Sequence, residues 1–568
     1  MQKTIKRRRQ RRSIDSFLVL LFLLISFSIP AQTTIQCDYE ITPAISAITN
    51  PIFKPGDTIC LMAGLRGPLY LKNLIGTSGN PIVIINKGGQ SIIDSDLSYG
   101  LKFADSKNVV VSGGGERNIE YGILLRQVTN GSGLDISNRS SDFEVERLEI
   151  SNTKTSGIVA KTEPNCIYLA DRNNFTMFNI KIHNNYIHHT GNEGMYIGSS
   201  FFLGQYLSAC DSFQFPHIID GVEIYNNRVE FTGWDGIQVG SALYNCNIHD
   251  NYIYKDSRAE QSYQMSGIII NTGSSCNVYN NRIIDGKGTG ILNQGSGGQK
   301  FFNNLIVNAG KDYYPEDQVL TQQFGIFSKY TYNQPPNSSF QFYNNTIINP
   351  KSDGIRFWNS PSENNRFINN LIINPGAYNY YKYLGSVNFQ ASDSYIHNYL
   401  DASVISASFN NIFERSTKAQ FFADTLNYDY HLTKYSPAVN FGYDLSSYGI
   451  TFDIDNYSRP FEYYFDIGAS ELQILTPVNS ISNPNEQLIL SPNPGAEFLY
   501  LNLSLDKFQY LDLMLVSIDG KLIKIIKNEL YQKGENIKQI SIGFLPKAEY
   551  VLVLYNQTNR FIQKFQKL

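Results

Sequence analysis

The stretch Val222-Glu223-Ile224-Tyr225-Asn226-Asn227 decides the fold of this chain. Its valine and isoleucine lie two residues apart and share one face, which is the period of a β-strand. The Asn-Asn pair that ends it returns along the chain at spacings of 23 to 42 residues, which indicate a unit of about 23 to 25 residues with occasional insertions. The further copies are Asn184-Asn185, Asn280-Asn281, Asn303-Asn304, Asn344-Asn345, Asn369-Asn370 and Asn410-Asn411, with Asp250-Asn251 as a near copy.

A second signature, glycine followed by an apolar residue, follows each pair. In Gly236-Ile237-Gln238-Val239 the apolar residues again alternate. The other copies are Gly157-Ile158, Gly194-Met195, Gly267-Ile268, Gly290-Ile291, Gly325-Ile326 and Gly354-Ile355. Two or three short strands in a unit that repeats along the chain predict the coils of a right-handed parallel β-helix. Asn tolerates left-handed backbone angles and stacks into amide ladders, so we interpret the pairs as turn ladders rather than ligands.

The composition indicates a folded, weakly charged protein that is exported. Residues 1–32 carry seven Lys or Arg and one acid, Asp15, and their apolar run spans 17–29. This pattern predicts a signal peptide, with an uncleaved signal anchor as the alternative. Removing that charge of +6 from the total of −3 leaves about −9 on the mature chain. Such a surface argues against nucleic acid as a partner, and we expect no integral membrane span in the mature chain and a monomer.

All six cysteines follow the predicted signal peptide, and export permits disulfides. Cys37 and Cys60 could form a disulfide that links two segments of the N-terminal cap. Cys246 and Cys276 each precede an Asn position by four or five residues, so they should stack on adjacent coils as a disulfide or as a buried thiol ladder. Cys166 and Cys210 are the remaining candidates, and no spacing suggests zinc.

Two regions resemble known secreted proteins. Within residues 33–130, the predicted N-terminal cap and first coils, Pro55-Gly56-Asp57-Thr58-Ile59 and the Gly-rich turns at 64–67 and 76–84 resemble the start of secreted right-handed β-helix polysaccharide lyases. Within 131–472, the predicted β-helix body and terminal coil, the stretch 428–472 resembles the closing coil of bacterial β-helix proteins. The resemblance implies the fold more than the activity, because this fold hosts many chemistries.

The C-terminal part has a different pattern. Residues 473–487 have the composition of a polar linker. In 488–568 apolar and polar residues alternate, which together with the Asp519-Gly520 turn predicts a small antiparallel β-sandwich. The opening Ser491-Pro492-Asn493-Pro494 and the basic tail 564–568 resemble the C-terminal sorting domain of type IX secretion cargo. Lys547-Ala548-Glu549-Tyr550 departs from that pattern, which has a glycine before the tyrosine. The resemblance implies the type IX machinery as a partner and a location outside a Gram-negative cell, either secreted or on its outer-membrane surface. An ordinary carbohydrate-binding or fibronectin-like module is the alternative.

Aligning the coils brings Glu193 and Asp235 to equivalent positions before their glycines, 42 residues apart in sequence. We expect both to point outward on adjacent coils, about 5 Å apart. Such carboxylates persist if they share a proton, meet a base or hold a cation. The spacing suits a retaining glycosidase pair and equally suits ligands for Ca²⁺. The remaining interpretation is that Glu193 and Asp235 are solvated acidic residues in turns and have no function.

The residues around this pair suggest a polysaccharide site. In a lyase reading Lys255 or His189 is the base, Arg258 neutralises the uronate carboxylate, and Glu193 with Asp235 holds calcium. The insertion 201–220 carries aromatic residues that suit sugar stacking, and Asp353 with Arg356 and Trp358 forms a second outward cluster. The expected substrate-binding residues are Tyr196, Gln238, Trp234, Phe201, Tyr206, Arg356 and Trp358.

Familiar catalytic signatures are missing from the sequence. There is no Asp-Asp pair of polygalacturonases, no Arg-x-Pro-x-x-Arg of pectate lyases and no Asn-Gly…Glu-x-Glu block of calcium-dependent lyases. The leading interpretation is therefore a secreted or surface β-helix protein that acts on or binds polysaccharide, as a lyase or a glycoside hydrolase. A non-catalytic surface adhesin or glycan-binding protein is the alternative. Calcium is the only cofactor expected.

Overall fold

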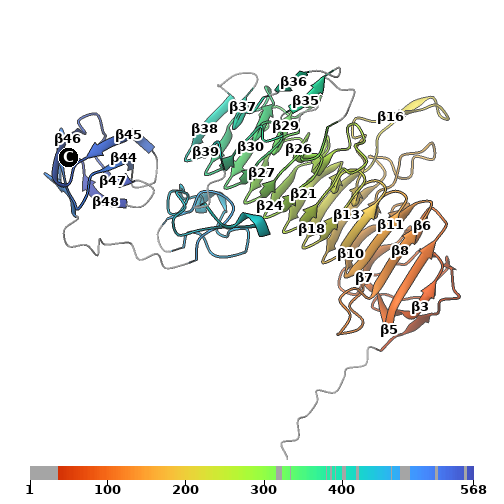
Figure 1. The fold of residues 1–568 in the computed structure, drawn as a ribbon. Coiled ribbons are helices and arrows are strands. Elements are labelled where there is room, and N and C mark those ends of the chain that lie inside the picture. Colours follow the sequence, from red (N-terminus) through yellow and green to blue (C-terminus); the bar gives the residue numbers. More distant parts are fainter. Residues whose placement is uncertain are drawn as a thin grey trace, which may run out of the picture. The chain divides into compact units, whose positions relative to one another are not determined.

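A computed structural model gives the fold (Figure 1). It describes residues 36–314, 323–332, 334–378, 380–383, 387–390, 392–398, 404–416, 421–461, 464–473, 487–517, 522–555 and 560–568. The predicted signal peptide, nearly all of the linker and the Asp519-Gly520 turn lie outside these residues. No helix among the described residues is long and apolar enough to cross a membrane.

Short parallel strands stack coil upon coil and confirm the predicted β-helix. The coils have three faces, named here in the order in which the chain meets them around the Asn pair. The first face, before each Asn pair, contains β7 (Lys107–Ser112), β10 (Ser141–Glu146), β13 (Thr176–His183), β18 (Ile218–Tyr225), β21 (Ala242–His249), β24 (Cys276–Tyr279), β27 (Gln299–Phe302), β30 (Phe340–Tyr343), β33 (Asn365–Ile368) and β38 (Ile405–Phe409).

The second face follows the Asn pair, and the third follows the glycine signature. The second contains β8 (Ile123–Val128), β11 (Leu148–Thr153), β14 (Tyr186–Thr190), β19 (Arg228–Glu230), β22 (Tyr252–Tyr254), β25 (Arg282–Ile284), β28 (Leu305–Val307), β31 (Thr346–Ile348), β34 (Leu371–Ile373) and β39 (Ile412–Glu414). The third contains β2 (Ala47–Ile48), β4 (Leu69–Lys72), β6 (Tyr99–Ala104), β9 (Ser132–Ser137), β12 (Ile158–Ala160), β15 (Met195–Ile197), β20 (Ile237–Val239), β23 (Ser266–Ile270), β26 (Thr289–Asn293), β29 (Ile326–Lys329), β32 (Ile355–Trp358) and β37 (Ile396–Asn398).

At the N-terminal end, longer strands serve two faces at once. β1 (Tyr39–Ile41) pairs with β3 (Thr58–Arg66), and β3 pairs with β5 (Ile82–Ser95). β5 in turn pairs with both β7 and β8, so one continuous strand precedes the first and the second face.

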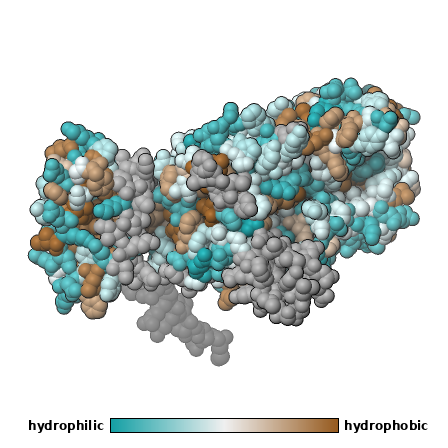
Figure 2. Space-filling view, turned by 90° about the horizontal axis from the view of Figure 1, so that it is seen from above, coloured by the Kyte–Doolittle hydropathy of each residue, from teal (hydrophilic) through white to brown (hydrophobic). Residues whose placement is uncertain are grey.

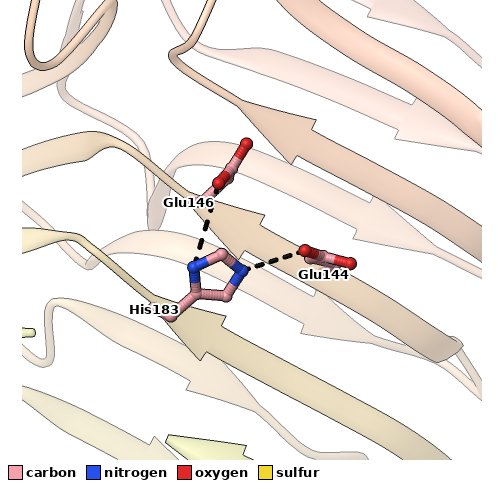
Figure 3. A group of neighbouring side chains, drawn as sticks. All are labelled: Glu144, Glu146 and His183. Carbon is pink, nitrogen blue, oxygen red and sulfur yellow. Dashed lines mark hydrogen bonds and ion pairs between the residues drawn. The ribbon is translucent and has the colours of Figure 1, made fainter. Parts of the chain in front are cut away.

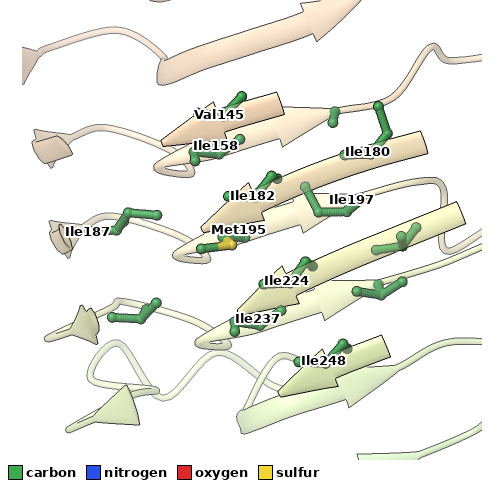
Figure 4. Packing of buried hydrophobic residues seen from close by; sticks show 14 of the residues in the cluster. Val145, Ile158, Ile180, Ile182, Ile187, Met195, Ile197, Ile224, Ile237 and Ile248 are labelled. Atoms are coloured by element: carbon green, nitrogen blue, oxygen red, sulfur yellow. The ribbon is translucent and has the colours of Figure 1, made fainter. Parts of the chain in front are cut away.

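The inside of the coils is a continuous apolar core. Ile224 and Ile237 come from different faces and are both fully buried (Figure 4). Ile182, Ile224 and Ile248 occupy the same position in successive coils of the first face. Burying one such side chain contributes about 1.5–3 kcal/mol, so the repeated apolar positions hold the coils together. On the outside, Figure 2 shows hydrophilic and hydrophobic residues interspersed over the face that it displays.

The second Asn of each pair forms a buried ladder along the axis. The Asn227 side-chain amide donates to Asn251 Oδ1 at 3.0 Å, and the Asn251 amide donates to Asn281 Oδ1 at 3.0 Å. The first Asn of the pair has a left-handed backbone, with φ of 51° at Asn226. The pair thus supplies one residue for the turn and one for the ladder, which confirms that it is a turn element.

The glycine signature follows from a close approach between coils. A Cβ at Gly236 would lie 2.5 Å from the carbonyl oxygen of Gly267 and 2.8 Å from Cγ2 of Ile253. No side chain fits there, so this coil needs glycine where it turns from the second face into the third.

Three disulfides join the six cysteines. Cys37 is bonded to Cys60, and Cys246 to Cys276 across adjacent coils, where their Cα atoms lie 4.4 Å apart. The third bond joins Cys166 to Cys210 and ties the 163–174 loop to a hairpin of β16 (Gln205–Leu207) and β17 (Ser212–Gln214), which projects from the coils (Figure 1). A further hairpin is formed by β35 (Tyr380–Tyr383) and β36 (Val387–Gln390).

Residues 421–472 include the stretch 428–472 that resembles a closing coil in sequence, and they lie along the outside of the second face. They contain the antiparallel β40 (Phe422–Asp424) and β41 (Asp429–Leu432) and the 3-10 turns η2 (Thr425–Asn427) and η3 (Ser446–Tyr448). Their apolar residues, including Phe421 and Ile467, pack on Val307 and Ile348 of the coils. Ala469 N donates to Thr346 Oγ1 at 2.8 Å. This segment, named here the lateral cover, buries the outward side chains of β25, β28, β31 and β34.

The C-terminal part forms two antiparallel sheets around its own core, as predicted for a sandwich. One sheet contains β42 (Gln487–Ser491), β43 (Phe498–Leu505) and β46 (Gly534–Ser541). The other contains β44 (Gln509–Ser517), β45 (Leu522–Tyr531), β47 (Glu549–Tyr555) and β48 (Arg560–Gln566). Leu501 and Leu552 are among the side chains that fill the space between them.

Candidate functional site

The second face changes character along the axis. On β25 to β34 its outward residues are mostly apolar and lie under the lateral cover. On β11, β14, β19 and β22 the outward residues are aromatic, charged or, at Ser151, polar. In register they are Glu149, Tyr186, Arg228 and Tyr252 in one row, and Ser151, His188, Glu230 and Tyr254 in the other. We call this part the open second face.

Two histidines and a glutamate form a hydrogen-bonded chain at the edge of this face. His188 Nε2 lies 3.3 Å from Glu149 Oε1, and His188 Nδ1 lies 2.8 Å from His189 Nδ1. The carboxylate accepts the His188 Nε2–H, so Nδ1 of a neutral His188 is an acceptor and His189 Nδ1–H must donate to it. This assignment leaves the lone pair of His189 on Nε2, which has no hydrogen-bond or ion-pair partner among the described residues.

His189 is exposed and lies in a cationic environment. The His189 ring stacks on Phe231 with 4.8 Å between ring centres. The Arg258 guanidinium lies 5.7 Å from the centre of the Phe231 ring. Partial burial, a charge on His188 when that ring is protonated, and the Arg258 guanidinium lower the pKa of His189. The imidazole is therefore neutral near pH 7, as a proton acceptor must be.

Hydrogen bonds connect three side chains in the middle of the open second face: Tyr186, Arg228 and Glu230. The Tyr186 hydroxyl donates to Glu230 Oε2 at 3.0 Å, and Arg228 Nε donates to Glu230 Oε1 at 2.8 Å. Burial and the Glu230 carboxylate raise the pKa of Tyr186 to about 12. The phenol thus stays protonated, and its ring presents a fixed aromatic surface next to a guanidinium.

A polar pocket of about 320 Å³ adjoins this network. Its lining residues are Glu120, Tyr121, Arg147, Asn184, Asn185, Asn226 and Arg228. Arg147 donates to the carbonyl oxygens of Ile119 and Glu120, which holds its guanidinium at the wall. Two arginines, amides and a tyrosine are the groups that bind hydroxyls and carboxylates of sugars.

The residues predicted to be catalytic divide into two groups. His189, Lys255 and Arg258 are exposed beside the open second face, and the Lys255 ammonium lies 5.1 Å from the centre of the Tyr254 ring. No ion pair among the described residues joins Lys255 or Arg258 to a carboxylate. Glu193 and Asp235 instead lie inside the turn between the second and third faces.

Glu193 and Asp235 are stacked on adjacent coils as predicted, but their side chains are buried rather than outward. Their exposed fractions are 2% and 0%. Both precede the first residue of their strand, so strand alternation does not set their direction. Ser156 Oγ donates to Glu193 Oε2 at 2.7 Å, whereas neither oxygen of Asp235 makes a hydrogen bond of ordinary geometry.

A third carboxyl, Asp256, completes this buried group. Burial raises the pKa of Asp256 to about 6, although Ser257 Oγ donates to it at 2.6 Å. Burial and the charges of Glu193 and Asp256 raise the pKa of Asp235 well above its usual range, and burial raises that of Glu193. Burial and mutual repulsion thus destabilise the charged forms of all three groups.

The remaining predicted binding residues lie on or near the third face. Tyr196 and Gln238 are adjacent outward residues in register. Tyr196 lies under the Lys161 ammonium, 3.7 Å from its ring centre, and Gln238 is buried. Trp234, half-buried, belongs to the turn before β20, where its carbonyl oxygen accepts from Thr232 Oγ1. Phe201 and Tyr206 are exposed on the 201–215 insertion.

Asp353, Arg356 and Trp358 are together, as the sequence suggested, but the ion pair is buried. Arg356 Nη2 lies 2.7 Å from Asp353 Oδ2, and its guanidinium is 4.7 Å from the Trp358 ring centre. Asp353 also accepts from the backbone N–H of Ser394 at 2.9 Å. These contacts position the cluster within the coils and leave little of it for a ligand.

Sequence reasoning missed the centre of the open second face. Tyr186, Arg228 and Glu230 follow the Asn pairs directly, at the first and third positions after them. In three successive coils the first and third residues after the Asn pair are Tyr and His, Arg and Glu, and Tyr and Tyr. In later coils they include Leu and Val, Thr and Ile, and Leu and Ile. That change from polar to apolar outward residues was the signal that separates an open surface from a covered one.

Comparison with known proteins supports the fold. Residues 133–398, from β9 to β37, match the protein family described as "Right handed beta helix region". The β-helix is thus right-handed. No curated protein matches the sequence.

Several solved structures are similar. A pectate lyase, Pel9A, has 12% identity and a TM-score of 0.36, with 77% of this chain and 97% of that chain covered. Tailspike protein 2 of bacteriophage CBA120, in its enzymatically active domain, has 10% identity and a TM-score of 0.34 over 90% and 72%. The A-module of the mannuronan C-5 epimerase AlgE4 of Azotobacter vinelandii has 12% identity and a TM-score of 0.27 over 64% and 91%. Likenesses this distant do not bear on activity.

Proposed function

We propose that this protein cleaves an acidic polysaccharide by β-elimination on the open second face. The observation that carries the proposal is the Glu149–His188–His189 chain, which leaves a neutral, exposed imidazole nitrogen beside an arginine. A base next to a cation is what the removal of a proton from the carbon beside a uronate carboxylate requires.

Each residue has a defined role in this reaction. His189 Nε2 takes the C5 proton, while Arg258 neutralises the carboxylate and so stabilises the developing negative charge. The electron pair of the C–H bond forms the C4–C5 double bond, and the C4–O4 bond breaks. The leaving oxygen takes a proton from the Lys255 ammonium or from water. In the alternative arrangement a neutral Lys255 amine takes the C5 proton in place of His189, and water protonates the leaving oxygen.

The rest of the face suits a polymer. Tyr186, fixed by Glu230, and Tyr121 at the pocket offer aromatic surfaces, and their ring centres lie 6.1 Å apart. Arg147 and Arg228 supply cations for further carboxylates along the chain. These local charges allow an acidic ligand on a protein whose net charge is negative.

The buried carboxyl group has a different proposed role. Glu193 and Asp235 do not reach solvent, so we assign them no contact with the polysaccharide. Glu193 and Asp235 supply oxygen donors of the kind that a hard cation such as Ca²⁺ takes, and a cation held by this pair would bind the folded form alone and stabilise it. The ligand atoms of Glu193, Asp235 and Asp256 do not all lie within 4.8 Å of one another, so we assign Asp256 no direct contact with the cation. A calcium titration of the thermal midpoint tests this: no upward shift in the wild type, or an equal shift in Asp235→Asn, contradicts a calcium site there.

The activity is tested with a panel of polysaccharides. The wild type and His189→Ala are incubated with uronate-containing and neutral polymers, and the unsaturated product is followed by its ultraviolet absorbance. We expect product from a uronate polymer alone and a loss of about 10²–10⁴-fold in His189→Ala. His249→Ala, on the first face, is the matched control and should retain activity.

The outcomes separate the two functions. Equal loss in both histidine variants contradicts the role of His189. If the wild type retains glycans without cleaving any polymer, the protein is a glycan-binding surface protein, which the tyrosines and the polar pocket of the open second face also suit. Loss of glycan retention in Arg228→Ala then places the binding on this face.

We also propose export and surface sorting. The support is the charge and apolar pattern of residues 1–32 and the resemblance of 488–568 to type IX cargo. Expression with and without 488–568 in a bacterium that has this secretion system, followed by fractionation, provides the test. Equal amounts outside the cell in both cases contradict a sorting role.

A further inference from the structure

The first face carries a group of metal-binding side chains that the proposed polysaccharide chemistry does not use. Glu144 and Glu146 are two residues apart on β10 and therefore point to the same side, and His183 pairs with Glu146 on the neighbouring β13 (Figure 3). One oxygen from each glutamate and one ring nitrogen lie within 4.8 Å of one another. Among the described residues this is the one group of three such ligands.

We infer that Glu144, Glu146 and His183 form a binding site for a divalent transition-metal ion of the Zn²⁺ class. An imidazole with two carboxylates matches the ligand preference of such ions, whereas Ca²⁺ and Mg²⁺ take oxygen ligands alone. Zn–N and Zn–O bonds of about 2.0–2.2 Å need ligand atoms roughly 3–4 Å apart. His183 Nε2 lies 2.9 Å from Glu144 Oε1, close to that separation. Glu146 Oε2 lies 3.8 Å from the other ring nitrogen, Nδ1, and one ligand atom from each of the three residues lies within 4.8 Å of the other two.

The neighbours of the three ligands hold them in place. Ser112 Oγ donates to Glu146 Oε1 at 2.7 Å, which leaves the second oxygen of that carboxylate for a metal. The Tyr225 ring stacks on His183 with 4.6 Å between centres and 8° between planes, and this contact fixes the imidazole. Ordered outer partners of this kind raise the affinity of a metal site.

Asn184 faces the ring nitrogen that does not bind the metal. In this structure its Nδ2 lies 2.9 Å from His183 Nδ1, so Nδ2–H donates to Nδ1 and the ring proton on Nε2 faces Glu144 Oε1. Metal binding at Nε2 requires that this proton move to Nδ1 and that the Asn184 amide turn so that its Oδ1 accepts from Nδ1–H. The metal then replaces the present hydrogen bond between His183 Nε2 and Glu144.

One cation already competes for this site. The Lys181 ammonium lies 3.1 Å from Glu144 Oε1. Both groups are partly exposed, so the ion pair contributes at most about 1 kcal/mol. A divalent ion with three ligands outweighs it, and the metal displaces Lys181 toward solvent.

The test is a calorimetric titration of the full chain with ZnCl₂ after dialysis against a chelator. All six cysteines are in disulfides, so no free thiolate competes for the metal. We expect one saturable site that CaCl₂ does not fill. His183→Ala and Glu146→Gln should weaken binding at least about tenfold, since even outer partners of a metal contribute ten- to a hundredfold.

Two further variants make the result specific. Lys181→Met removes the competing cation, and binding should become up to about fivefold tighter. His249→Ala is the matched control, because His249 stands in the same stacked column with 5.1 Å to Tyr225, and it should bind zinc like the wild type. His188→Ala excludes the histidine pair of the second face in the same way.

Three results would overturn the inference. The first is no saturable zinc binding by the wild type. The second is unchanged binding in both His183→Ala and Glu146→Gln. The third is an equal loss in His249→Ala, which would reflect damage to the stacked column instead of a lost ligand. None of these results affects the proposed cleavage reaction, which takes place on another face.

Discussion

Asp256 is fully buried, and its replacement by asparagine should change how the stability of the β-helix depends on pH. Burial raises its pKa from 3.8 to about 6, which is a difference of about two units. At 1.36 kcal/mol per unit this amounts to about 3 kcal/mol between the two protonation states. Asparagine has nearly the same shape as the protonated acid and carries no charge at any pH.

The sign follows from the raised pKa. The folded state holds its proton more tightly than the unfolded state, so the stability that this proton provides is fully present below pH 4. It is lost as the pH rises from about 4 to about 6, and the loss is complete above that range. Asp256→Asn should therefore match the wild type near pH 4 and exceed it by up to about 3 kcal/mol at pH 7.5.

Urea unfolding followed by tryptophan fluorescence measures this difference. Both tryptophans, Trp234 and Trp358, lie in the coils, so the signal reports the β-helix alone. Asp96→Asn, at an exposed carboxylate, is the control and should leave the pH profile unchanged. If the free energies of unfolding of Asp256→Asn and the wild type differ by the same amount at every pH from 4 to 7.5, then Asp256 is not a buried acid with a raised pKa.

Three further outcomes follow from the fold. Asn281→Ala should lower the free energy of unfolding in urea by about 2–4 kcal/mol, because it leaves buried partners of the ladder unpaired. Asn226→Gly, at an exposed left-handed residue, should change it by no more than about 1 kcal/mol. Equal losses would contradict the separate roles of the first and second Asn of a pair. Cys166→Ser with Cys210→Ser should make the 201–215 insertion sensitive to limited proteolysis and leave the unfolding of the coils nearly unchanged; cleavage in the coils at the same rate would contradict this. Ile348→Asp should detach the lateral cover from the coils, because it puts a charge between the cover and β31. Limited proteolysis should then cleave within 421–472 well before it cleaves the coils. If 421–472 stays uncleaved, other contacts hold the cover in place.

Much of the fold could be predicted because its determinants are local. The Asn226-Asn227 turn, the glycine at 236 and the alternation around Ile224 each follow from backbone geometry and strand period. Repetition then multiplies a weak local signal into a firm prediction of stacked coils. The Cys246–Cys276 contact followed from the same register, although the sequence left open whether the two thiols are bonded.

The site was predicted less well because strand alternation does not extend into turns. Asp235 precedes its strand, and its side chain enters the corner of the coil instead of pointing outward. The sequence placed His189 and Arg258 near one another but gave no reason to connect His188 to Glu149, since the two lie on different coils. That contact depends on the register of β11 against β14.

The sequence by itself determined that this protein is a stack of short parallel strands followed by a separate antiparallel domain, because period and turn residues act over a few neighbours. Only the tertiary structure decided which outward residues are available. Residues 421–472 fold back over β25 to β34 and cover an apolar strip, while the polar strip on β14 and β19 stays open. The physical reason is that burial depends on what packs against a surface, and this cover lies more than a hundred residues away in sequence from β25 and β28.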